Sequence, residues 1–138
     1  MQKALDPGIS TWPEKDPQLI ASRCHGCAAM TFPAQECCPN CSQLPMVSVP
    51  LPRSGTLVSW TTQGFLPGAP YVGGKDPKKF TPFGVGLVQL GDLLRVEGRL
   101  TENDPDKLKF GMDVELVMVP LAIDEHGDEL ITFAFRPL

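Results

Sequence analysis

Long hydrophobic runs are missing from this sequence. Its apolar stretches are short and broken by glycine, proline or charge, so none reaches the roughly 20 residues of a membrane-spanning helix. Residues 1–10 also lack the basic start and the apolar block of a secretory signal. We therefore expect a cytoplasmic protein with no membrane partner.

Histidine and arginine are also scarce. The two histidines are His25 and His126, and neither has a nucleophile close in sequence that it could activate as a base. No catalytic residue is predicted, and we do not expect this chain to catalyse a reaction alone. The net charge of −4 and the small number of arginines disfavour a nucleic-acid role, because phosphate affinity comes mostly from Lys and Arg.

Proline and glycine, by contrast, are abundant, with 15 and 13 residues. Proline interrupts helices and inner strands, so short strands joined by turns are expected rather than a helical bundle. Period-two alternation of apolar and polar residues predicts five strands, at 55–62, 83–90, 93–100, 113–119 and 130–136.

Turns are predicted at residues 91–92 and 124–128, and a short helical or turn connection at 104–112. Five short strands with a long loop between the first two suit a small closed barrel such as the OB-fold. Periodicity does not determine the order of the strands. We predict a mainly β chain with an N-terminal arm (1–17), a rubredoxin-like zinc ribbon and linker (18–52) and a five-stranded OB-fold barrel (53–138).

Four cysteines form two C-x2-C pairs, Cys24 with Cys27 and Cys38 with Cys41. Two intervening residues allow a tight turn to direct both sulfur atoms at one ion, and four thiolates satisfy tetrahedral zinc. A disulfide pair or a redox motif is the alternative, but no secretory signal favours disulfides. We therefore expect one structural zinc ion whose closed shell leaves no position for a substrate.

Two further residues are possible competitors for the metal. Cys37 precedes the second pair and could replace Cys38, but the matched spacing favours Cys38 and leaves Cys37 as a spare thiol. His25 lies inside the first pair, and with four cysteines present we expect it to be exposed.

With these residues in place, the chain resembles the zinc-ribbon/OB-fold family catalogued as domain of unknown function thirty-five. The resemblance extends from about Leu19 to the C-terminus. Its departures are Cys37 and a long lysine-containing insertion between the first two barrel strands. The matching segments are 23–28, Phe32-Pro33, 38–41, 55–60, Pro70-Tyr71, 111–114 and 135–137.

The resemblance implies a non-catalytic partner subunit of a thiolase-like enzyme, which can be a thiolase, an acyltransferase or an aldolase. In such complexes the partner carries the catalytic residues and acts on acyl-CoA. The zinc-ribbon/OB-fold subunit is thought to stabilise it and to help form the CoA and substrate channel. A heterotetramer is the expected assembly.

The long loop at 63–82 is the predicted contact region for CoA or the partner. Loops on a rigid barrel often carry binding residues, and lysine can attract phosphate. An ordinary solvated loop is the competing interpretation. The candidates are Phe65, Tyr71, Lys75, Lys78, Lys79 and Phe80.

Aromatic side chains on an OB-fold also suggest a different function, an independent protein that binds single-stranded nucleic acid by base stacking. The acidic balance of the chain makes this the weaker hypothesis. Trp60 is more simply a core residue, and Phe133 and Phe135 share one face of the last strand as core or interface residues.

Overall fold

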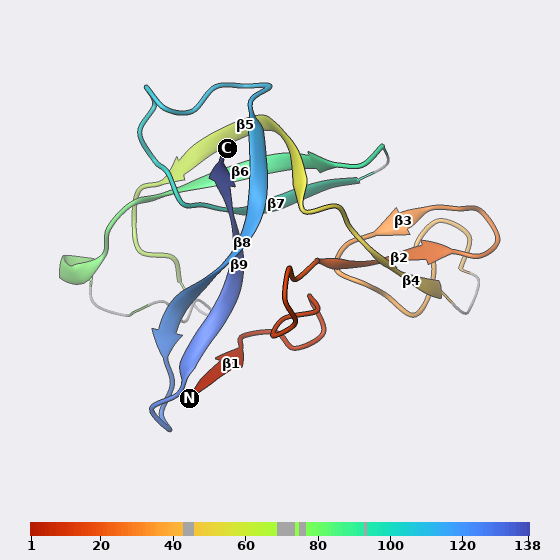
Figure 1. Ribbon diagram of the computed structural model, residues 1–138, viewed down its shortest axis with the longest axis horizontal. Coiled ribbons are helices and arrows are strands. Elements are labelled where there is room, and N and C mark those ends of the chain that lie inside the picture. Colours follow the sequence, from red (N-terminus) through yellow and green to blue (C-terminus); the bar gives the residue numbers. More distant parts are fainter. Residues whose placement is uncertain (43–45, 69–73, 75–76, 93) are drawn as a thin grey trace.

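The computed structural model describes residues 1–42, 46–68, 74, 77–92 and 94–138, and these are organised mainly as β-strands (Figure 1). They form a six-stranded sheet and a three-stranded sheet. The elements are β1 (Gln2–Ala4), β2 (Ile20–Cys24), β3 (Met30–Thr31), β4 (Met46–Pro50), β5 (Ser54–Gln63), the 3-10 turn η1 (Pro77–Lys79), β6 (Phe83–Leu90), β7 (Leu94–Leu100), β8 (Asp113–Ile123) and β9 (Glu129–Pro137).

The larger sheet closes into a five-stranded barrel. Strand β5 pairs with β6, β6 with β7, β7 with β9, β9 with β8, and β8 again with β5. The β7–β9 pair is parallel and the other pairs are antiparallel. Closure removes free edges from the barrel strands, which confirms the predicted OB-fold barrel.

The connections follow the predicted turns. Gly91 has a φ of 69° in the turn between β6 and β7, and in the last hairpin the N–H of Asp124 donates to the carbonyl of Asp128 at 2.9 Å. The connection at 104–112 consists of turns and places Leu108 in the core. Strand β8 continues to Ile123, so the β8–β9 hairpin is longer than predicted.

Glycines on the inner side of the barrel make room for its core. A Cβ on Gly98 would lie 2.8 Å from Cε2 of Phe135 and 2.9 Å from Cε2 of Phe133. Phe135 is fully buried and Phe133 is partly buried against the core, as is Trp60. The small barrel interior is therefore already filled by these rings, and only glycine fits opposite them.

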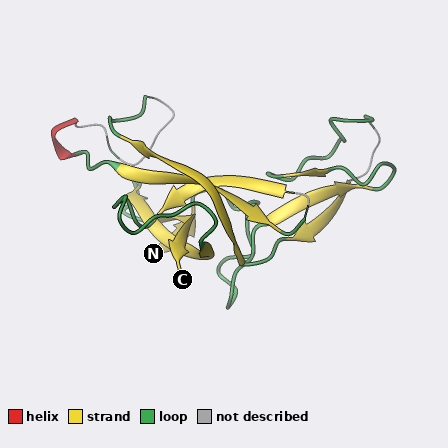
Figure 2. Cartoon of the chain, turned by 90° about the horizontal axis from the view of Figure 1, so that it is seen from above, coloured by secondary structure: helices red, strands yellow, loops and turns green. Residues whose placement is uncertain are grey.

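The three-stranded sheet, in the order β3-β2-β4, lies beside the barrel (Figure 1). Ala21 in β2, with Leu19 just before β2 and Leu51 just after β4, belongs to the same buried cluster as barrel residues Leu57 and Leu90. The two sheets therefore share one continuous hydrophobic core. Figure 2 shows this sheet at one end of the molecule and η1 at the other.

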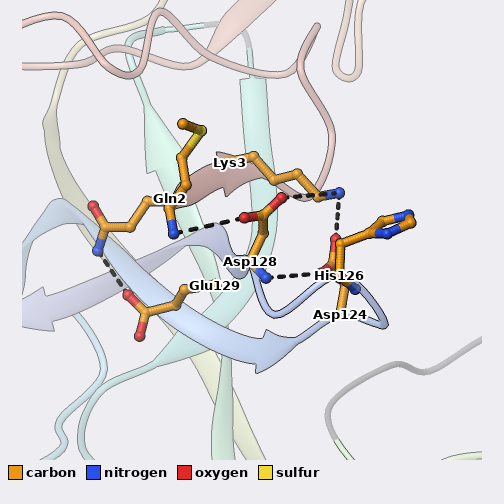
Figure 3. A network of polar contacts seen from close by, with 7 residues as sticks. Gln2, Lys3, Asp124, His126, Asp128 and Glu129 are labelled. Carbon is orange, nitrogen blue, oxygen red and sulfur yellow. Dashed lines mark hydrogen bonds and ion pairs between the residues drawn. The ribbon is translucent and has the colours of Figure 1, made fainter.

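The N-terminal segment, predicted as an arm, contributes a strand to the larger sheet. β1 runs parallel to β9, with Gln2 opposite Glu129 and Ala4 opposite Ile131. The side-chain amide of Gln2 donates to Glu129 at 2.6 Å, and Lys3 forms ion pairs at the tip of the β8–β9 hairpin (Figure 3). Among the described residues, no helix has the length and apolar character needed to cross a bilayer.

Candidate metal centre and binding surfaces

The four predicted metal ligands come together at one end of the three-stranded sheet. Cys24 ends β2, and the sulfur atoms of Cys24, Cys27, Cys38 and Cys41 all lie within 4.8 Å of one another. The Sγ atoms of Cys24 and Cys41 are 3.4 Å apart, and those of Cys27 and Cys38 are 3.6 Å apart. Zn–S bonds of about 2.3 Å place tetrahedral ligands about 3.8 Å apart, so this donor set fits one zinc ion.

Backbone N–H groups surround the sulfur atoms in the same way in both C-x2-C turns. The N–H groups of Gly26 and Cys27 donate to Cys24 Sγ at 3.3 Å. Those of Asn40 and Cys41 donate to Cys38 Sγ at 3.4 and 3.5 Å. The repeated geometry explains why the spacing of two residues matters, because each turn brings two donors to its first sulfur.

These contacts favour the thiolate form that a metal requires. The side-chain amide of Asn40, 3.5 Å from Cys27 Sγ, is the main cause that lowers the pKa of Cys27 to about 6. The backbone N–H of Cys27 is the main cause that lowers the pKa of Cys24. Hydrogen bonds to a charged group stabilise it, so the site is prepared to release protons when metal binds.

The two competing residues lie outside the four-sulfur cluster. Cys37 is exposed, and its Sγ lies 3.9 Å from the carbonyl oxygen of Cys38. His25 is exposed. Four cysteine ligands would complete a tetrahedral shell, which is the arrangement of structural zinc sites.

Four of the six predicted contact residues lie within the described structure. Phe65 is 74% exposed, and Lys78 and Lys79 are exposed around η1. Phe80 is half-buried and packs edge-on against Phe83, with ring centroids 6.0 Å apart. The described end of the loop is thereby attached to the barrel at the start of β6. Tyr71 and Lys75 lie outside the described residues.

A pocket of about 290 Å³ was not predicted from the sequence. It lies where β6 begins and β7 ends, and Phe83, Arg99 and Asn103 are among its lining residues. The sequence signal that could have identified Arg99 as a pocket residue is its outward position in the alternating pattern of β7. Asn103 has no comparable signal because it follows the strand in an irregular turn.

Comparison with known proteins gives matches over both parts of the chain. The family described as "ChsH2, rubredoxin-like zinc ribbon domain" matches residues 11–44, and "ChsH2, C-terminal OB-fold domain" matches residues 48–119. The zinc-ribbon match and the four-cysteine cluster confirm the predicted zinc cofactor.

Individual relatives match over most of their length. A DUF35 domain-containing scaffold protein of Methanocaldococcus jannaschii is 28% identical over 120 residues, covering 86% of this chain and 79% of that protein. The benzoylsuccinyl-CoA thiolase subunit BbsA of Thauera aromatica is 30% identical over 122 residues, covering 88% of this chain and 78% of that protein.

A solved structure shows the same arrangement. The structure described as an Ltp2-ChsH2(DUF35) aldolase superposes with a TM-score of 0.62 at 28% identity, covering 87% of this chain and 84% of that one. Taken with its zinc ribbon and OB-fold barrel, this chain belongs to the DUF35 family of zinc-ribbon/OB-fold proteins.

Proposed function

We propose that this chain is a non-catalytic subunit of a complex with a thiolase-like enzyme that acts on an acyl-CoA. The observation that carries the proposal is the similarity to BbsA, a thiolase subunit, over 88% of this chain. The likeness to a chain of an aldolase described with ChsH2(DUF35) supports the same role. The partner performs the reaction, and this chain stabilises it and helps to form the CoA and substrate channel.

The composition of the metal centre supports a scaffolding role. Cys24, Cys27, Cys38 and Cys41 are the proposed zinc ligands, and four thiolates leave the ion no open position for water or substrate. Within the described ranges, these cysteines are the one group of three or more potential ligands close enough to hold a metal. The zinc ion thus holds the three-stranded sheet together beside the barrel.

The loop at 63–82 is the proposed contact region for the partner or for CoA. Phe65 exposes a large apolar surface, and Lys78 and Lys79 are solvent-exposed cations in the same loop. A loop that exposes both an aromatic side chain and cations suits a protein interface or the phosphates of CoA. Phe80, Tyr71 and Lys75 complete the predicted set.

The proposal is tested by purifying the full chain from its native host under gentle conditions and weighing the complex by native mass spectrometry. We expect a second chain of thiolase size, in a two-plus-two assembly. The acyl-CoA reaction should be present in the complex and absent from this chain alone. A solitary chain in the native host, or turnover of an acyl thioester by the isolated chain, would contradict the proposal.

A further inference from the structure

One pocket shares no residue with the metal centre and borders the end of the long loop, where Pro82 is one of its lining residues. Its walls are the start of β6 with Phe83 and Gly84, the end of β7 with Arg99, the following turn with Asn103, and the middle of β8 with Val119 and Pro120. Its volume is about 290 Å³. This is at the lower end of the range for small-molecule sites, so the pocket suits one part of a larger ligand.

The pocket carries an isolated positive charge. Among the described residues that line it, Arg99 is the one charged side chain and none is a carboxylate. Cζ of Arg99 lies 4.0 Å from the centroid of the Phe83 ring, a cation–π contact that holds the guanidinium against β6. Within the described structure no carboxylate or other acceptor pairs with this guanidinium, whereas Arg136 pairs with Glu115 and Arg53 with Asp16.

Asn103 adds a second donor to the same pocket. Its Oδ1 accepts a hydrogen bond from the Thr62 hydroxyl at 2.8 Å, so the remaining hydrogen-bonding group of the amide is the Nδ2 donor. No acceptor for this Nδ2 occurs among the residues that the structure describes. Arg99 and Asn103 therefore offer N–H donors, while Val119 and Pro120 supply apolar wall.

This combination is selective for an oxyanion attached to a partly apolar group. A guanidinium presents its N–H groups in a planar fork that matches the oxygens of a phosphate, and such charge-assisted bonds are stronger than neutral ones. The chain as a whole has a net charge of −4, so general attraction does not explain anion binding at this place. The recognition has to come from the local donors.

We propose that this pocket binds the phosphate-bearing nucleotide end of a CoA thioester, with Arg99 and Asn103 as the phosphate-binding residues. The choice of CoA as the ligand rests on the proposed function, but the phosphate-binding pocket itself rests on the geometry. Because the pocket holds only part of a CoA, the acyl end extends outside it. Arg99 thereby supplies a phosphate contact separate from the loop lysines Lys78 and Lys79.

The test is a titration of the zinc-loaded full chain, 15N-labelled, with adenosine 3′,5′-bisphosphate, the phosphorylated nucleotide part of CoA. Adenosine without phosphate is the matched neutral probe, and inorganic phosphate is the third arm. We expect the bisphosphate to shift the Arg99 Nε–H and Asn103 side-chain signals and adenosine to leave them unchanged. Inorganic phosphate should bind at least about tenfold more weakly than the bisphosphate, because it lacks the nucleoside that would contact the apolar wall.

Arg95 provides a matched control. It lies on the same outward face of β7 as Arg99, and its Nε donates to Oε1 of Gln89 at 2.9 Å. Arg99→Gln and Arg95→Gln remove the same charge from the same strand. We expect Arg99→Gln to weaken bisphosphate binding about tenfold or more and Arg95→Gln to change it less than about twofold. Arg99→Lys keeps the charge but not the planar fork of N–H groups, so its bisphosphate affinity should lie between those of the two glutamine variants. It replaces Arg99→Gln in the test if that variant does not fold.

Equal weakening by the two glutamine variants, or no response to the bisphosphate, would overturn the pocket assignment. Equal binding of inorganic phosphate and the bisphosphate would overturn the nucleotide as its ligand. Capture of the thiolase-like chain is measured in parallel, so that failure of the pocket assignment can be told apart from failure of the proposed function. Arg99→Gln should still capture that chain. If Arg99→Gln loses capture and the unsubstituted chain binds no bisphosphate, Arg99 is a protein contact and the pocket assignment is refuted. Bisphosphate binding by a chain that captures no partner would refute the proposed function alone.

Discussion

Lys3 in the first strand forms an ion pair with Asp124 at the tip of the last hairpin (Figure 3). The same carboxylate accepts hydrogen bonds from the backbone N–H groups of His126 and Asp128, each at 2.9 Å. The Lys3 ammonium also lies 3.9 Å from the carboxylate of Asp128. This small network attaches the N-terminal strand to the hairpin turn.

The first prediction concerns the pH dependence of that network. The hydrogen bond from Lys3 is the main cause that lowers the pKa of Asp124 from 3.8 to about 2. A carboxyl group whose pKa is lower in the folded state stabilises that state above its unfolded pKa. The stabilisation is lost as pH falls through the folded pKa. We expect Asp124→Asn to unfold at lower urea concentration than the unsubstituted chain at pH 7, with the difference shrinking between about pH 4 and pH 2.

Asn at position 124 keeps an acceptor for the turn, so the substitution isolates the charge. Glu125→Gln is the control, since Glu125 is exposed and its Oε1 lies 3.5 Å from Nε2 of the neighbouring His126. It should leave the urea midpoint nearly unchanged at every pH. A constant difference between Asp124→Asn and the unsubstituted chain from pH 7 to pH 2 would contradict the assigned role of the ion pair.

The second prediction concerns the identity of the zinc ligands. Cys41→Ser should lose the metal and disorder the three-stranded sheet, because zinc supplies folding free energy to a module with a small core. Cys37→Ser should retain one zinc ion per chain, since the Cys37 sulfur lies outside the four-sulfur cluster. Elemental analysis gives the zinc content, and amide signals from β2 and β4 report the fold. Loss of zinc from Cys37→Ser would show that the ligand assignment is wrong.

The third prediction concerns packing inside the barrel. Gly98→Ala should lower the free energy of unfolding by ~1–3 kcal/mol, because a Cβ there meets the rings of Phe133 and Phe135. Gly64→Ala is the matched control, with no atom within 4 Å of its added carbon, and should change stability by no more than about 0.5 kcal/mol. Urea denaturation measures both. Similar midpoints for the two variants would mean that the barrel relaxes around the extra methyl group.

The fourth prediction concerns the proposed partner surface. Phe65 and Phe110 are similarly exposed, at 74% and 70%, and lie in different loops. Phe65→Ala should weaken capture of the thiolase-like chain, and Phe110→Ala should not. Neither substitution should alter the melting temperature appreciably, since neither ring is buried. Equal capture by both variants in quantitative pull-downs would remove Phe65 from the interface.

The fifth prediction concerns nucleic acid. We expect no salt-sensitive binding of a single-stranded oligonucleotide at low salt, because the net charge of −4 disfavours a continuous phosphate track. Fluorescence anisotropy with a labelled oligothymidine measures this directly. Tight binding that weakens steeply with added salt would instead support the nucleic-acid hypothesis.

Much of the fold could be predicted from local patterns. The strand predicted at 83–90 coincides with β6, and in the structure its even-numbered residues, including Val88 and Leu90, are buried. The two C-x2-C spacings predicted the metal cluster because each is a property of one turn. The extension of β8 beyond Val119 to Ile123 was not predicted. It contains Pro120, and the pairing with β9 has an irregular register between Pro120 and Ala122.

The amino-acid order by itself determined the β class, the cysteine pairs and the positions of most turns, since these depend on neighbours along the chain. Only the tertiary structure decided that β9 lies between β7 and β8 and that β1 joins β9. It also decided that Arg99 and Asn103 line one pocket. The physical reason is that barrel closure brings together residues from distant strands, and period-two alternation records only which side of its own strand each residue faces.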